Sequence, residues 1–333
     1  MSENFKAALA RSVTGWCAGA TGIANAARLS GGASQETWSF DIERPDGALG
    51  AILRRAPAGY TTPLERAAGL DAEAVLMRSA LEAGIPSPRV LHVLTPEDGL
   101  GTGFVMARVA GETIPRKILR DALYADVRPK LARQIGGVLA KMHALDSARL
   151  PALRRLNSSS EIAELTQEYR SFGWPRPVFE LALRWLAGND PGPPPRETLV
   201  HGDFRHGNLI IGPDGVRAVI DWELAHVGDP MEDLGWVCVN SWRFGEIDKP
   251  VGGLGTREDL YAGYADEGGH VDPARARFWE VMGTLRWGVM CCGMMQRFRN
   301  GPDHSLERAM IGRRASEAEI DLLRLLAPRA GGG

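Results

Sequence analysis

The sequence has few cysteines, and it has no long uninterrupted apolar run. Its four cysteines form no C-x-x-C pair, and the adjacent Cys291 and Cys292 cannot form an unstrained disulfide, so we expect reduced, mostly buried thiols. No window approaches the roughly 18 apolar residues that a membrane span needs. The first residues lack the basic and apolar segments of a signal peptide. These absences predict a cytoplasmic protein without a membrane partner.

Charge of one sign is also lacking. The chain of 333 residues has 39 Lys and Arg against 41 Asp and Glu, a net charge of −2, which gives no reason to expect a nucleic-acid partner. Only five of the cations are lysines, and with the abundant alanine and glycine this favours a GC-rich bacterial genome. The length allows one large or two ordinary domains. Nothing in the composition indicates the oligomeric state.

The most informative stretch runs from Leu199 to Trp236, LVHGDFRHGNLIIGPDGVRAVIDWELAHVGDPMEDLGW. Two short β-branched runs, 209–211 and 216–220, flank the turn sequence GPDG, which predicts a β-hairpin. The outer ends of the two strands would bring Asn208 and Asp221 side by side. Asp203 precedes the hairpin in the same loop, so we expect three side-chain oxygen donors to converge.

This set of donors suits phosphoryl transfer from a nucleotide. Such a reaction needs Mg²⁺ on the phosphates and a carboxylate that orients the acceptor hydroxyl. Mg²⁺ commonly takes one or two protein oxygens, here from Asn208 and Asp221, while Asp203 faces the hydroxyl. The order His-x-Asp, then Asn, then Asp is the catalytic-loop pattern of protein kinases, with Gly202 in place of arginine.

Hydrophobic periodicity predicts the other elements. We expect strands between about residues 25 and 54 and at 90–93 and 104–109. We expect helices at 3–17, 69–83, 125–146, a pair within 159–187, and 256–266, 273–299 and 305–326.

The segments HGDFRHGN, IDWE and GDPMEDL resemble the aminoglycoside phosphotransferase and choline kinase superfamily, which has a kinase-like fold. Within it, the chain is most similar to kinase-like domains fused to acyl-CoA dehydrogenases and to their free-standing bacterial relatives. The resemblance implies a two-lobed α+β fold. Its nucleotide-binding lobe, 1–109, holds a five-stranded antiparallel sheet, and its mainly helical catalytic and acceptor-binding lobe is 110–333.

The resemblance also implies roles for residues of the first lobe. Ser34, in the sequence SGGAS, would contact phosphates. Arg54 stands where the family has a phosphate-binding lysine, with Arg55 as the second choice, and Glu73 would pair with that cation. ATP would bind through its adenine to backbone at the lobe crossing, at Ala107 and Val109.

Several alternatives stay open. Arg205 either stabilises the transferring phosphoryl group or forms a structural ion pair. A transition-metal hydrolase site could instead use imidazole and carboxylate ligands. The arginine at position 54 also fits a nucleotide-binding pseudokinase with a regulatory role. The residues of that metal alternative are His201, Asp203, His206 and Asp221.

The predicted activity is Mg²⁺- and ATP-dependent phosphorylation of a hydroxyl group on a small molecule. The resemblance makes a hydroxy acid or a hydroxyacyl-CoA the leading acceptor, with an aminoglycoside or amino-alcohol as the alternative. Residues 273–299 contain five arginines and one glutamate interleaved with tryptophan and methionine. If this segment lines the acceptor site, it suits an anionic or amphipathic molecule better than a polycation.

Overall fold

The computed structural model of the chain describes residues 3–29, 35–56, 67–146, 150–301 and 304–327. The chain divides into two compact units. The first consists of Met1–Thr113, Leu145–Arg154 and Gly207–Ala225, and the second of Ile114–Ala144, Arg155–His206 and His226–Gly333. The lobe boundary that we expect after residue 109 stays a prediction.

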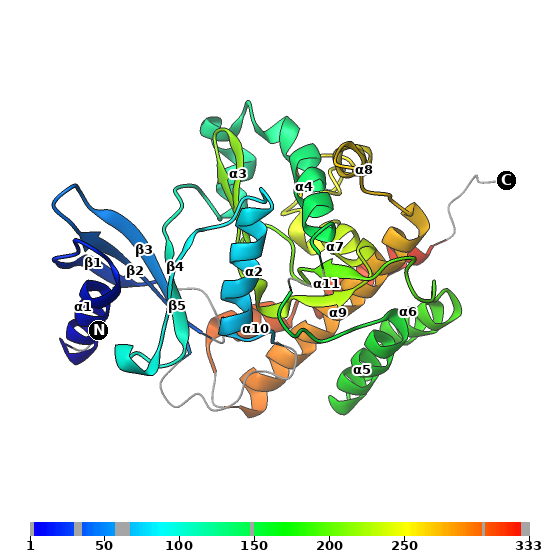
Figure 1. Ribbon diagram of the computed structural model, residues 1–333. Helices are drawn as coiled ribbons and strands as arrows, with labels where there is room; N and C mark the ends of the chain where they lie inside the picture. Colours follow the sequence, from blue (N-terminus) through cyan, green and yellow to red (C-terminus); the bar gives the residue numbers. More distant parts are fainter. Residues whose placement is uncertain (1–2, 30–34, 57–66, 147–149, 302–303, 328–333) are drawn as a thin grey trace. The chain divides into compact units, whose positions relative to one another are not determined.

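The first unit contains a five-stranded antiparallel sheet in the order β1-β2-β3-β5-β4 (Figure 1), as the sequence predicts. Alternation places Trp38, Phe40 and Ile42 of one strand in the core, where they pack with Leu9 and Val13 of the first helix. The elements are α1 (Glu3–Trp16), β1 (Gly22–Arg28), β2 (Glu36–Glu43), β3 (Leu49–Arg55), β4 (Val90–Val93), η1 (Pro96–Asp98) and β5 (Gly103–Ala107).

The first unit also contains helix α2 (Leu70–Glu82) and the hairpin of β7 (Leu209–Gly212) and β8 (Gly215–Val219). The hairpin forms where the GPDG turn predicts it, although one irregularity interrupts its register. Contacts that join it to the rest of the unit include the Val219 N–H, which donates to the Pro86 carbonyl at 2.9 Å, and the bridge between Glu112 and Ile211. A short 3₁₀ helix, η4 (Trp222–Leu224), follows the hairpin.

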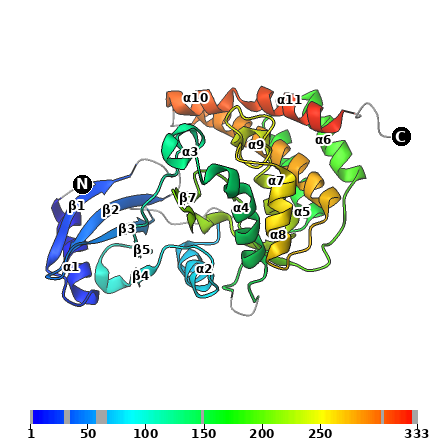
Figure 2. The same ribbon diagram turned by 90° about the horizontal axis from the view of Figure 1, so that it is seen from above.

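The second unit is mainly helical. Its longest helix, α9, contacts α5, α6, α7, α10 and α11. Figure 2 shows α10 and α11 next to α9. The predicted helix 305–326 is two helices, because α10 ends at Gly312, whose backbone lies too close to Met295 for a side chain. The elements are α3 (Pro115–Arg120), η2 (Ala122–Tyr124), α4 (Arg128–His143), α5 (Ser158–Ser171), α6 (Pro177–Gly188), β6 (Thr198–Val200), β9 (His226–Gly228), α7 (Met231–Trp236), η5 (Asn240–Trp242), α8 (Arg257–Asp266), α9 (Pro273–Asn300), α10 and α11 (Leu306–Gly312 and Ala315–Leu326).

Helices α4 and α8 touch through glycines. A Cβ atom at Gly136 would lie 2.0 Å from the Leu260 carbonyl oxygen, and one at Gly263 would lie 1.9 Å from the Arg133 carbonyl oxygen. Only residues without a side chain allow the two backbones to approach so closely. About two turns after Gly136, His143 at the end of α4 contacts the Tyr264 hydroxyl at 2.9 Å.

In the part of the chain that the structure describes, no helix has both the length and the apolar character required to cross a bilayer. All four cysteines are free thiols, and three of them, Cys238, Cys291 and Cys292, are buried, as expected. Burial raises the pKa of the Cys238 thiol to about 12, so this group stays protonated and unreactive at neutral pH.

Candidate active site

The base of the β7–β8 hairpin brings two of the predicted metal ligands together. The Ile220 N–H donates to the Asn208 carbonyl at 2.9 Å, which closes the hairpin just before Asp221. Asn208 is buried, whereas 29% of the Asp221 side chain is exposed. The structure thus places Asn208 opposite Ile220, the residue before Asp221, and their joint binding of a metal ion stays a prediction. Asp203 belongs to the other compact unit, so its convergence with them stays a prediction.

Asp221 has an unusual backbone conformation. Its φ of 66° and ψ of 63° lie in the left-handed region, which only Asn25 and Phe244 share among the described residues other than glycine. A conformation of this kind costs free energy and is concentrated at functional sites. It turns the chain sharply between β8 and η4 and fixes the direction of the carboxylate.

Arg54, at the end of β3, is the cation that meets Asp221. Its guanidinium forms ion pairs with Asp221, with Glu73 of α2 at 3.2 Å and with Glu223 at 3.5 Å. The predicted pairing of Arg54 with Glu73 is therefore present. Arg55 points elsewhere and pairs with Glu36 at 2.8 Å, which leaves Arg54 as the candidate phosphate ligand.

This cluster of Arg54, Glu73, Asp221 and Glu223 has three carboxylates for one guanidinium. Burial raises the pKa of Glu73 to about 7, and repulsion from Asp221 and Glu223 acts in the same direction, against the attraction of Arg54. An excess of carboxylates over cationic side chains suits a hard divalent cation. The residues present therefore fit Mg²⁺ held by Asn208 and Asp221.

Asp203 lies in the loop after β6, in the second unit. Its Oδ1 atom accepts hydrogen bonds from the Arg205 Nε and from the Trp236 indole N–H, each at 2.9 Å. Arg205 also donates to the His206 carbonyl at 2.9 Å and stacks over the Trp242 ring at 4.7 Å. The structural ion pair considered for Arg205 is thus present, and its phosphoryl-stabilising role stays a prediction.

A buried carboxylate, Asp233 of α7, holds the backbone of this loop. It accepts hydrogen bonds from the N–H groups of His201 at 2.8 Å and Gly202 at 3.0 Å. His143 adds a third contact, at 3.2 Å. Although burial raises the pKa of Asp233, these partners hold it below its ordinary value. His143, His201 and Asp233 thus form one hydrogen-bonded group that holds this loop.

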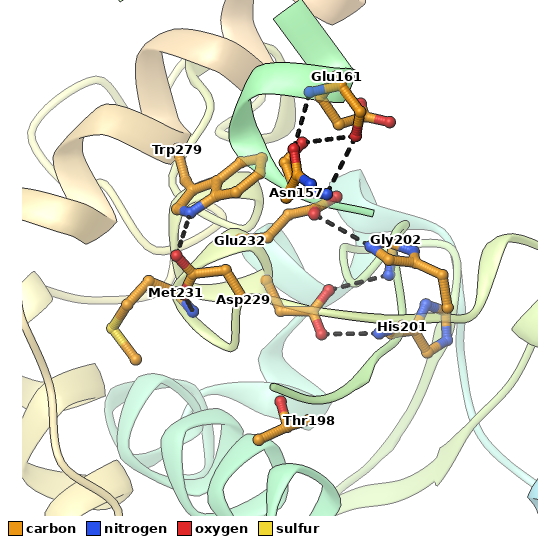
Figure 3. Close-up of polar contacts among 12 residues, drawn as sticks. Asn157, Glu161, Thr198, His201, Gly202, Asp229, Met231, Glu232 and Trp279 are labelled. Carbon is orange, nitrogen blue, oxygen red and sulfur yellow. Dashed lines mark hydrogen bonds and ion pairs between the residues drawn. The ribbon is translucent and has the colours of Figure 1, made fainter. Parts of the chain in front are cut away.

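Two further acids of the segment GDPMEDL are also matched with donors (Figure 3). Asp229 accepts from the Met231 N–H, the Trp279 indole and Arg275, at 2.8 to 2.9 Å. Glu232 contacts His226 at 3.1 Å and Arg286 at 2.9 Å. Two of the arginines of α9 thus bind carboxylates within the unit, and a third, Arg277, binds the Leu325 carbonyl. These contacts remove three of the five arginines from the predicted acceptor site.

Three predictions remain: the phosphate contact of Ser34, the adenine contact of Ala107 and Val109, and the alternative transition-metal site. Ser34 lies outside the described residues. Ala107 ends β5 and donates its N–H to the Arg89 carbonyl at 2.8 Å, and Val109 follows it, so their contact with adenine stays a prediction. Across the described ranges, no group of three or more His, Cys, Asp or Glu side chains is placed to hold a metal ion. The alternative transition-metal site is therefore not assembled there.

One site residue escaped sequence reasoning. Trp236 has no role in the sequence-based predictions, yet its indole contacts Asp203 across 33 positions. A tryptophan at a helix end is usually a core residue, and nothing in its spacing indicates a polar contact.

Comparison with known proteins places the chain among phosphotransferases. The model of a family described as the phosphotransferase enzyme family matches residues 25–279. The acyl-CoA dehydrogenase family member 10 of Mus musculus is 30% identical over 195 residues, which cover 56% of this chain and 18% of that protein. The acyl-CoA dehydrogenase family member 11 of Homo sapiens is 27% identical over 245 residues, 70% of this chain and 30% of that protein. The chain spans less than a third of either relative, and the expected bacterial source stays a prediction.

Solved structures share the fold. A Ralstonia eutropha protein provisionally described as an aminoglycoside phosphotransferase has a TM-score of 0.73 at 19% identity, with 96% of this chain and 97% of that chain covered. A choline/ethanolamine kinase family protein of Mesorhizobium loti has a TM-score of 0.63 at 21% identity, with 97% and 98% covered. These likenesses confirm the two-lobed, kinase-like α+β fold class that the sequence predicts.

Proposed function

Because the chain belongs to the phosphotransferase enzyme family, we propose that it transfers the γ-phosphoryl group of ATP, with Mg²⁺, to a hydroxyl group of a small molecule. One observation carries the proposal. Asn208 and Asp221 lie together at the base of a hairpin, and Asp221 is held in a strained conformation beside an arginine. Phosphoryl transfer needs these groups, while a purely structural hairpin needs neither the strain nor the excess of acids.

In this proposal the first unit binds the nucleotide. Asn208 and Asp221 would hold Mg²⁺, which when bound neutralises charge on the phosphate oxygens. Arg54 binds phosphate oxygens through its planar guanidinium, and Glu73 fixes its orientation from α2. A solved phosphotransferase of this fold, APH(4)-Ia, was crystallised with ADP and hygromycin B, which supports a nucleotide donor for this chain.

Asp203 orients the acceptor hydroxyl and accepts its proton. As the acceptor oxygen bonds to the γ-phosphorus, the bond from that phosphorus to the β–γ bridging oxygen breaks and ADP leaves. Arg205 contributes positive charge next to Asp203. The Asp233 contacts keep the loop backbone fixed while the proton moves, because the loop does not have to reorganise at that moment.

The leading acceptor is a hydroxy acid or its acyl-CoA thioester. The support comes from the relatives, which are acyl-CoA dehydrogenase family members with a segment that resembles this chain. An aminoglycoside or amino-alcohol is the alternative, supported by the names of the solved structures. Arginine content of α9 no longer separates the two classes, because Arg275, Arg277 and Arg286 serve the fold.

A second candidate function rests on a different observation. The Arg54 guanidinium contacts Asp221 directly, which is a pairing that competes with a metal ion for the same carboxylate. A protein that keeps this pair closed would bind a nucleotide without turning it over and act as a regulatory pseudokinase. Binding of ATP without ADP formation is its signature.

The test is an assay of ADP formation from Mg²⁺-ATP with a panel of acceptors. The panel contains 3-hydroxybutyrate, 4-hydroxybutyrate, 3-hydroxybutyryl-CoA, choline and kanamycin, with GTP as a second donor and EDTA as the metal control. We expect ADP and a phosphorylated product in equal amounts, from a hydroxy acid or hydroxyacyl-CoA, and none with EDTA. ATP binding without ADP formation from any acceptor overturns the enzyme proposal in favour of the regulatory one.

A further inference from the structure

The indole of Trp236 lies directly against the carboxylate of Asp203. Its N–H donates to Asp203 Oδ1 at 2.9 Å, and the Arg205 Nε donates to the same oxygen at the same distance. A carboxylate on a loop rotates about two side-chain bonds unless donors fix it. Two donors on one oxygen fix the plane of the Asp203 carboxylate, one from the neighbouring loop residue and one from the end of α7.

Trp236 is itself rigidly held. Its side chain is buried, and the guanidinium of Arg286 stacks over its ring at 4.2 Å. Arg286 also donates to the Gly202 carbonyl at 3.0 Å and to Glu232 at 2.9 Å. The same arginine of α9 therefore supports the backbone before Asp203 and the ring that contacts Asp203.

We infer that Trp236 is a positioning residue for phosphoryl transfer, which holds the Asp203 carboxylate in the orientation that accepts the hydroxyl proton. This inference rests on the proposed function. An indole N–H is a donor only, so Trp236 can hold the carboxylate without competing for the proton that Asp203 accepts. A serine or histidine in its place would offer an acceptor as well.

The neighbouring tryptophans show that packing alone does not explain this contact. Trp236, Trp242 and Trp287 form one aromatic cluster, with ring centroids 5.2 Å and 4.9 Å apart for the successive pairs. Within the described residues, the indole nitrogens of Trp242 and Trp287 are buried without a hydrogen-bond partner. Of these three tryptophans, only Trp236 donates a hydrogen bond from its indole N–H, and the acceptor is the proposed catalytic carboxylate of Asp203.

The experiment compares Trp236→Phe with Trp287→Phe. Both variants keep an aromatic ring, but only the first removes a hydrogen bond to Asp203. With Mg²⁺-ATP and 3-hydroxybutyryl-CoA or the other acceptors of the panel, we expect kcat to fall roughly 10- to 100-fold in Trp236→Phe, because the misplaced carboxylate weakens only the chemical step. The KM for ATP stays within about twofold of wild type, since no nucleotide contact is lost. Trp287→Phe keeps the wild-type kcat.

Equal kcat values in the two variants, with wild-type turnover present, would overturn this inference alone. A wild-type chain without turnover overturns the proposed function, and this inference with it. If Trp236→Phe does not fold, Trp236 is replaced by benzothienylalanine, in which sulfur takes the place of the N–H and the ring shape is kept. The same fall in kcat is expected there, and wild-type kcat overturns the inference.

Discussion

Around Arg54, three carboxylates face one guanidinium, whereas in the second unit each of the buried acids of α7 and the loop before it has its own donors. Asp233 accepts two backbone N–H groups and a histidine, while Asp221 has a single arginine that it shares with Glu73 and Glu223. Under the proposed function, the first arrangement would take up a further cation, whereas the acids of the second are matched by donors of the protein itself. The difference separates carboxylates that bind a ligand from carboxylates that hold the fold, although both occur within one short stretch of sequence.

The largest expected effect is a loss of turnover on substitution of Asp203, in the loop that Asp233 holds. Asp203→Asn keeps an oxygen for the Trp236 and Arg205 donors but cannot take a proton, so we expect kcat to fall by roughly 10³-fold. ATP affinity, measured by titration calorimetry, should stay within about twofold of wild type. Asp248→Asn, at an exposed loop position, is the control. A rate for Asp203→Asn within about tenfold of wild type would remove Asp203 from the chemistry.

The next effect is on stability. Asp233→Asn places an amide NH₂ group against one of two backbone N–H donors, so it leaves a buried donor without an acceptor. We expect a loss of about 3 kcal/mol in the free energy of unfolding, measured by urea denaturation. Asp266→Asn removes an exposed carboxylate that pairs with Arg133, and should cost less than about 1 kcal/mol. Equal losses in the two variants would contradict the role of the buried Asp233 contacts in holding the loop.

In contrast to Asp233→Asn, the substitution Asp221→Asn should weaken ligand binding and leave the stability unchanged. Asparagine tolerates the left-handed conformation of this position, so the backbone keeps its turn. We expect the Mg²⁺-dependent part of ATP affinity to weaken about 100-fold, equivalent to about 2.7 kcal/mol, without loss of stability. Asp214→Asn, in the turn of the same hairpin, is the matched control. Unchanged Mg²⁺ dependence in Asp221→Asn would place the metal elsewhere.

The smallest effect is a pH dependence of the ligand-free protein. Because the pKa of Glu73 is raised to about 7 in the folded chain from an ordinary value of 4.5, the folded state holds a proton that the unfolded state has lost between these pH values. This contribution to stability is complete below pH 4.5 and is lost as pH rises through 7. Between pH 5 and pH 7 it amounts to about 2 kcal/mol.

Glu73→Gln should flatten this part of the profile of unfolding free energy against pH, whereas Glu82→Gln, at an exposed position of the same helix, should leave it unchanged. A profile that keeps its slope in Glu73→Gln would show that burial, with the neighbouring acids, does not raise the pKa of Glu73.

Local signals in the sequence predicted the hairpin and the two residues proposed as metal ligands at its base. The GPDG turn indicates which strand ends meet, so the placement of Asn208 and Asp221 at the base of one hairpin could be predicted from turn chemistry. The pairing of Arg54 with Glu73 was accessible only through resemblance to a family, because 18 intervening residues separate them. The choice between Arg54 and Arg55 needed the register of β3.

Other features had no local signal. The left-handed conformation of Asp221 is imposed by the meeting of β8 and η4, since aspartate has no strong preference for it. The Trp236–Asp203 contact and the Asp233 contacts with His201 and Gly202 join positions more than 30 residues apart. The break between α10 and α11 depends on the close approach of Gly312 to Met295, which only the packed structure shows.

The close glycine contact between α4 and α8 also affects the position of the loop that carries Asp203. Tyr264 follows Gly263 directly, and its hydroxyl meets His143, which in turn meets Asp233 beneath the loop. The spacing of two helix axes is thereby passed on, through a phenol and an imidazole, to the peptide groups next to Asp203. A single methyl group added at residue 136 or 263 would act as a wedge, and its displacement would be felt at a carboxylate that it never touches.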